Sequence, residues 1–155
     1  MNYPRQRQKK SRGRPSYDPR IYSCCGFVCP FRVQDGHEGC QDLLYMAIDR
    51  DIEIIISPLT ISKIWSSPDF DRKSEIGYLG LLEFISIYSC DTNIAISTGH
   101  YLREYSNDIK LDLEMASFVS ICNISGYPLV TTNPELYQGI LERAINCEEA
   151  LKQLN

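Results

Sequence analysis

The feature that most constrains this chain is the alternation of helical patterns with very short apolar runs. Residues 52–56 are dominated by isoleucine and predict a buried strand. Residues 84–88 and 129–131 predict two further strands. Between these runs, apolar residues recur every three or four positions, which is the spacing of an amphipathic helix. Alternating helices and short buried strands predict an α/β fold, with a parallel sheet covered by helices on both faces.

Residues that begin and end helices divide the chain further. Ser57-Pro58 has the form of an N-cap followed by proline at the first helical position, and Ser66-Ser67-Pro68 ends that helix. Three more helices are predicted from residue spacing around 43–48, 76–82 and 94–105. A further helix is expected from about Pro134 to the end of the chain. The remaining predicted boundaries are Asp91 or Thr92 and Asp112 as N-caps, and Gly126 as a C-terminal glycine.

Length and composition set the class of protein. The chain has 155 residues, which suits one domain, and 43% of them are hydrophobic, which is enough for a core. The sequence has no apolar run near the roughly 20 residues that span a membrane, and no apolar stretch follows the basic N-terminus as in a secretory signal. We therefore expect one domain over residues 20–155 behind a flexible arm, residues 1–19, in a cytoplasmic protein without membrane contact.

The seven cysteines raise the question of metal binding. An odd number of cysteines in a chain without an export signal predicts reduced thiols. Four of them cluster between residues 24 and 40, yet no pair has the two-residue separation common in zinc sites. We therefore expect buried or free thiols and no zinc.

Charge is distributed unevenly along the sequence. Residues 1–20 hold seven Lys and Arg against one Asp, a charge of +6, which leaves −10 for the rest of a chain whose total is −4. A basic arm on an acidic body suits contact with nucleic acid, although a solvated tail or an arm that folds back on the body has the same composition.

The arm also resembles an AT-hook, a short DNA-binding motif. Its glycine lets an extended backbone enter the minor groove, and its arginines are drawn to the negative potential of narrow A·T tracts. The resemblance implies a partner of A·T-rich DNA. The residues that carry it are Lys9, Lys10, Arg12, Gly13, Arg14 and Pro15.

The order of segments from residue 21 to residue 137 resembles the PIN domain, a nuclease fold found in many toxin–antitoxin toxins. Residues 128–133 read Pro-Leu-Val-Thr-Thr-Asn, which is similar to the last strand of the family and its T-x-N ending. Residues 54–60 resemble the second strand and the start of the next helix, and residues 102–105 read Leu-Arg-Glu-Tyr, similar to a motif before the third acidic position. The resemblance implies a three-layer α/β/α fold with a short parallel central sheet.

The same resemblance implies a chemistry that this chain departs from. PIN nucleases gather carboxylates at the carboxyl ends of the strands, where they hold Mg²⁺ or Mn²⁺ ions that activate water against a phosphodiester. Aligned with the family, Cys24 and Met115 replace aspartates and Lys63 replaces a glutamate. Pro134 or Leu136 aligns with the family's last acidic residue. Asn133 is then the only residue of the former nuclease pocket that matches the family's polar residues.

These substitutions predict a protein with no catalytic residues, no metal and no cofactor. Met115 on a helix and Cys24 at a strand end are residues that most often belong to a hydrophobic core. Lys63 either pairs with a nearby acid such as Asp42 or Glu114, or places its ammonium in the former metal pocket. The leading prediction is a DNA-associated regulatory or scaffolding protein that forms a homodimer, as PIN domains commonly do.

Two alternatives remain open. A metal-dependent ribonuclease with displaced acids would use Glu114 and Glu135 as ligands. A protein–protein interaction module would bind a protein partner, and its basic arm would be incidental.

Overall fold

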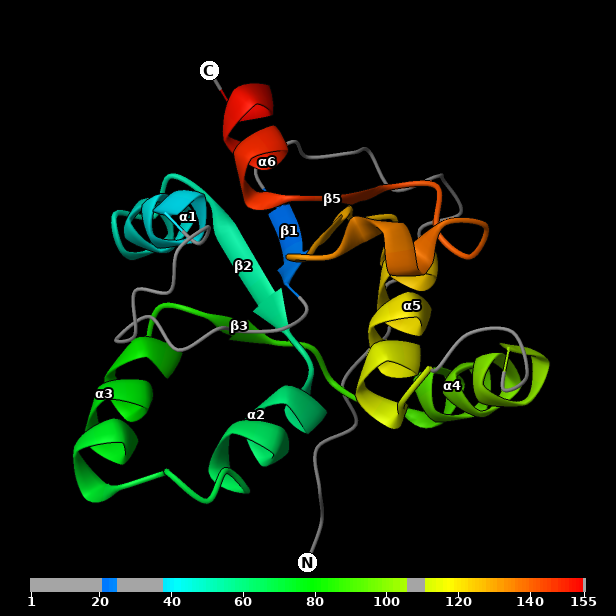
Figure 1. Ribbon diagram of the computed structural model, residues 1–155, viewed down its shortest axis with the longest axis horizontal. Helices are drawn as coiled ribbons and strands as arrows, with labels where there is room; N and C mark the ends of the chain where they lie inside the picture. Colours follow the sequence, from blue (N-terminus) through cyan, green and yellow to red (C-terminus); the bar gives the residue numbers. More distant parts are fainter. Residues whose placement is uncertain (1–20, 25–37, 106–110, 155) are drawn as a thin grey trace, which may run out of the picture.

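A five-stranded, entirely parallel sheet forms the centre of the computed structural model (Figure 1), which describes residues 21–24, 38–105 and 111–154. The strand order is β3-β2-β1-β4-β5, and every neighbouring pair is parallel. The predicted arm lies outside the described residues. The strands are β1 (Ile21–Cys24), β2 (Glu53–Ile56), β3 (Ser86–Ile87), β4 (Leu129–Val130) and β5 (Ala144–Ile145).

The alternation of side chains along the strands creates two cores. Ile54, Ile56 and Val130 belong to one cluster, whereas Leu129, the immediate neighbour of Val130, belongs to the other. Successive side chains of a strand point to opposite faces, so each face of the sheet has its own core. The helices that cover these faces are α1 (Glu38–Ile48), α2 (Pro58–Trp65), α3 (Arg72–Leu82), α4 (Thr92–Tyr105), α5 (Leu113–Ser125) and α6 (Cys147–Leu154), with the short 3-10 helix η1 (Pro134–Tyr137).

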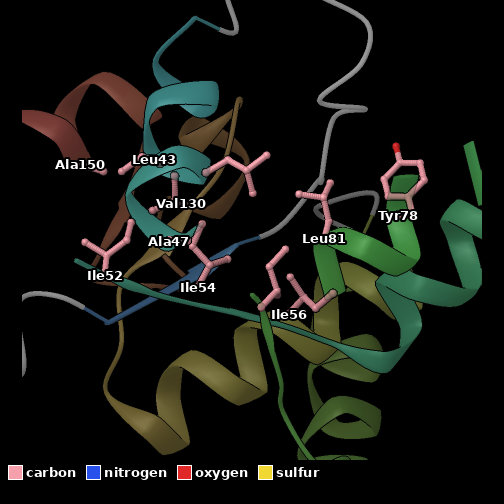
Figure 2. Close-up of a cluster of buried hydrophobic side chains, with 11 residues drawn as sticks. Leu43, Ala47, Ile52, Ile54, Ile56, Tyr78, Leu81, Val130 and Ala150 are labelled. Carbon is pink, nitrogen blue, oxygen red and sulfur yellow. The ribbon is translucent and has the colours of Figure 1, made fainter. Parts of the chain in front are cut away.

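Each core joins particular helices to the sheet. Figure 2 shows Leu43 and Ala47 of α1, and Tyr78 and Leu81 of α3, on the same side of β2. Residues of α6 join this first core. On the other face, α5 packs Phe118 and its neighbours against β4. The predicted three-layer α/β/α arrangement with a short parallel sheet is therefore confirmed.

The predicted helix boundaries coincide with capping hydrogen bonds. Ser57 Oγ accepts a hydrogen bond from the Leu59 amide at 3.2 Å, and Pro58 takes the first position of α2. Asp91 and Asp112 accept from amides of the first turns of α4 and α5. Gly126 ends α5 with φ of 79°, a left-handed conformation that glycine adopts without steric strain.

One expectation about local structure is wrong. The segment after Pro134 is not one helix, because η1, β5 and α6 follow one another there. A two-residue strand such as β5 carries no periodic pattern, so its pairing with β4 had no signal in the sequence. The helix predicted around residues 76–82 is confirmed as α3, which buries Tyr78 and Leu81 and leaves Ile76 and Leu79 exposed. Tyr78 packs near Trp65 and Phe70 of the α2–α3 hairpin.

The expectation that all cysteines are reduced is also wrong. Cys40 of α1 and Cys147 of α6 form a disulfide across 107 residues of sequence. The spacing of cysteines could not reveal this pair, since the fold brings the first turns of two distant helices together. Cys90 is an exposed free thiol, and Cys122 is buried in the second core. In the part of the chain that the structure describes, no helix is long and apolar enough to cross a membrane.

Candidate functional site at the carboxyl edge of the sheet

Three helices begin at the edge where the parallel strands end, here called the carboxyl edge. α2 follows β2 directly, and α4 starts a few residues after β3. α4 and α5 run in the same sense, because Thr98 bonds to Ser120 at 3.2 Å and, one turn further along both helices, Asn123 donates to Tyr101 at 2.6 Å. The N-terminus of α5 therefore lies at the same edge, where parallel α/β sheets usually carry their functional groups.

An ion pair joins α2 to α5 at this edge. Lys63 Nζ lies 2.5 Å from Glu114 Oε2 and 3.5 Å from Asp112 Oδ2. The Glu114 side chain is only 7% exposed, whereas that of Lys63 is 61% exposed. The hydrogen bond to Glu114 outweighs partial burial and holds the pKa of Lys63 above its usual value, so the ammonium stays protonated at neutral pH. A buried carboxylate is therefore neutralised by a cation from a neighbouring helix.

A contact between two serine hydroxyl groups joins the two helices that carry the ion pair. Ser57 and Ser117 are buried, their Oγ atoms lie 3.0 Å apart, and Ser117 donates to the Glu114 carbonyl at 2.7 Å. This contact ties the N-cap of α2 to the first turn of α5. Asp112 uses one carboxylate oxygen to cap α5 through the Met115 amide and the other to face Lys63. The position of Glu114 thus follows from the local structure of both helices.

Lys63 and Met115, two residues of the predicted nuclease pocket, make different contacts. Lys63 lies at the carboxyl edge, and its partner is Glu114 rather than Asp42. Met115 does not face Lys63, because it packs against the second core beside residues such as Phe118. The acid of α5 at the pocket is thus one residue earlier than the alignment placed it. A helix turns about 100° per residue, so neighbouring residues face different directions. Glu114 therefore faces Lys63 while Met115 faces the second core.

The other two predicted positions lie at strand ends. Cys24 ends β1 and pairs through its backbone with Val130 of β4. Asn133 is exposed just before η1, and its amide donates to Thr131 Oγ1 at 3.3 Å. The predicted DNA-binding residues 9–15 lie outside the described residues.

Of the residues that the structure describes at this edge, the set of Lys63, Asp112 and Glu114 does not fit a divalent metal ion. Mg²⁺ and Mn²⁺ require several oxygen ligands, and an ammonium offers none. Lys63 occupies the space beside the two carboxylates, and Glu135 is an exposed residue of η1. Among residues 39–105 and 111–154, no three His, Cys, Asp or Glu side chains gather closely enough to hold a metal ion.

Comparison with known proteins identifies the fold. The chain is similar to the crystal structure of VapBC2 from Rickettsia felis bound to a DNA fragment from their promoter. The TM-score is 0.61 and the sequence identity 16%, and the match covers 81% of this chain and 98% of the other. No protein-family model and no curated protein matches the sequence. The likeness shows a PIN-like fold, as the order of sequence motifs predicts.

Proposed function

We propose that this protein is a PIN-like protein without metal-dependent nuclease activity that acts as a DNA-associated regulatory or scaffolding factor. The observation that carries the first part is the contact of Lys63 with Glu114 and Asp112, at the edge where the PIN family holds its metal. The second part is supported by the composition of residues 1–20 and by the DNA that the VapBC2 structure contains.

The ion pair explains how the fold remains stable without a metal. A buried carboxylate without a counter-charge is strongly unfavourable, and in a nuclease the metal ion supplies that charge. Here the Lys63 ammonium supplies it from within the chain. At a separation of about 4 Å, two unit charges interact by roughly 4 kcal/mol near a protein surface, so the same ammonium opposes an entering cation. One substitution thus both stabilises the site and excludes the metal.

The described chain begins at the edge where the parallel strands start, which is opposite to the carboxyl edge that holds this ion pair. Ile21 is the first residue of β1 and pairs with Glu53, the first residue of β2. The PIN-like domain would remain available on its other surfaces for association with a second copy or another protein.

The full chain is expected to bind an A·T-rich duplex more tightly than a G·C-rich duplex of equal length, with affinity falling as salt rises. Fluorescence anisotropy would measure this preference. The double change Arg12→Ala and Arg14→Ala should abolish it. The control change Lys9→Ala and Lys10→Ala removes the same charge, and should weaken binding to both duplexes alike. Equal A·T preference in the arginine variant and the parent would remove the AT-hook hypothesis.

A shortened chain that starts at Tyr17, tested on DNA and RNA with and without Mn²⁺, isolates the contribution of the domain.

A homodimer is the second expectation, and we place its interface on the outer face of α3. Ile76 and Leu79 are 63% and 53% exposed there, and Gly80 leaves open space beside them for a second helix. Light scattering at tens of micromolar should give the mass of a dimer. Leu79→Lys should give a folded monomer, whereas Ile124→Lys, at a comparably exposed site on α5, should stay dimeric. A monomeric parent would refute this expectation.

A further inference from the structure

The C-terminal helix α6 depends on α1 for its stability. It has only eight residues, and helices shorter than about 12 residues are marginal on their own in water. Its start is well defined locally: Asn146 Oδ1 accepts from the Glu149 amide at 2.8 Å, and Glu149 Oε2 accepts from the Asn146 amide at 3.2 Å. This reciprocal capping box favours the first turn but cannot hold the helix on the domain.

Docking of α6 rests on the packing of Ala150, Leu151 and Leu154 with the first core and on one covalent bond. Ala150 is fully buried in the first core, where Figure 2 shows it beside Leu43 of α1. The backbones approach closely, because a Cβ at Gly39 would lie 3.4 Å from both the Cys147 Cβ and the Glu148 amide nitrogen. At this point the Cys40–Cys147 disulfide joins the two helices. Both cysteines are half-buried rather than enclosed in the core.

We propose that the Cys40–Cys147 disulfide is a reversible redox switch that controls whether α6 is docked on α1. A dithiol reductant attacks one sulfur as its thiolate and forms a mixed disulfide, and the released cysteine sulfur takes up a proton. The second thiol of the reductant then displaces the other cysteine and becomes part of a cyclic disulfide. Two electrons and two protons pass to the protein, which now has two thiols.

Reduction uncovers a defined apolar surface. α6 packs chiefly against α1, so loss of that contact releases the helix while the central strands stay paired. Leu43 and Ala47 of α1 and Val130 of β4 lie in the core that α6 helps to cover. Segments held by few contacts are among the first to open in a folded protein. The redox state of one bond would thus determine whether this face of the domain is closed or accessible.

Hydrogen exchange tests this proposal on the full chain, first oxidised and then treated with excess dithiothreitol. Mass spectrometry of alkylated peptides first establishes that Cys40 and Cys147 are paired and then reduced. In the reduced protein, amides of α6 should exchange at least tenfold faster than the loss of global stability alone would cause, whereas those of α5 should exchange no faster than the limit set by global unfolding. The double change Cys40→Ser and Cys147→Ser should reproduce the reduced state without reductant, and Cys90→Ser should respond as the parent does.

Three results would overturn the proposal. The bond could resist dithiothreitol in the folded protein, which would make it a permanent staple. Protection of α6 could be the same in the two redox states, which would show that packing alone holds it. Protection could be lost in α5 and α6 together, which would show global unfolding rather than release of one helix.

Discussion

Replacing Phe118 by alanine is expected to lower the free energy of unfolding by roughly 3–5 kcal/mol. Phe118 is completely buried in the second core, where α5 packs against β4 and η1. Truncation removes its transfer free energy and leaves a cavity that the surrounding residues fill only in part. In a domain of this size, each kcal/mol corresponds to about 2–4 °C in Tm, so the midpoint should fall by roughly 10 °C.

Chemical denaturation followed by circular dichroism measures this loss. Phe84→Ala is the matched control, because the same atoms are removed from a side chain that is 40% exposed. The control should lose clearly less stability than Phe118→Ala. Equal losses would contradict the assignment of Phe118 to the core between α5 and the sheet.

Breaking the disulfide is expected to have an effect of similar size. Cys40 and Cys147 are 107 residues apart in sequence, and cross-linking so long a loop restricts the unfolded chain strongly. The chain-entropy relation gives about 4–5 kcal/mol for a loop of this length, with engineered and strained bonds giving less. The oxidised protein should therefore unfold at a clearly higher denaturant concentration than the same protein in dithiothreitol.

The variant Cys147→Ser provides an independent measure of the same effect. Its midpoint should match that of the reduced parent and should not respond to dithiothreitol. Cys90→Ser, which removes an exposed free thiol, should retain the full difference between oxidised and reduced protein. A parent whose midpoint is identical in the two redox states would show that the bond contributes nothing to stability.

The fold was predictable because its signals are local. Ser57, Asp112 and Gly126 mark helix ends through short-range hydrogen bonds and backbone conformation, and each does so in the structure. The isoleucines of β2 likewise report burial on both faces of the sheet. β5 and the Cys40–Cys147 disulfide were missed because each depends on contacts between distant segments. Such contacts leave no periodic pattern in one sequence.

The candidate site was predictable in part for the same reason. The position of Lys63 follows from its place in the last turn of the helix that Ser57 begins. The acid that meets it depends on the rotation of α5 about its axis, which the Ser57–Ser117 contact and the core packing of Met115 set together. The alignment with the family located the helix but could not determine that rotation, so Glu114 rather than Met115 faces the site.

The central claim is that Lys63 has closed a former metal site. Titration calorimetry with Mn²⁺, on the parent and on Lys63→Glu, tests it most directly. Lys63→Glu puts a third carboxylate beside Asp112 and Glu114, and it should bind Mn²⁺ and be stabilised by it, because a ligand that binds only the folded state raises stability. The control Lys63→Met removes the ammonium without adding a ligand, and should bind Mn²⁺ less tightly than Lys63→Glu.

The parent is predicted to show neither heat of Mn²⁺ binding nor a shift in Tm. Stoichiometric binding of Mn²⁺ by the parent, lost in Glu114→Gln, would contradict the claim and would favour a metal-dependent ribonuclease with displaced acids.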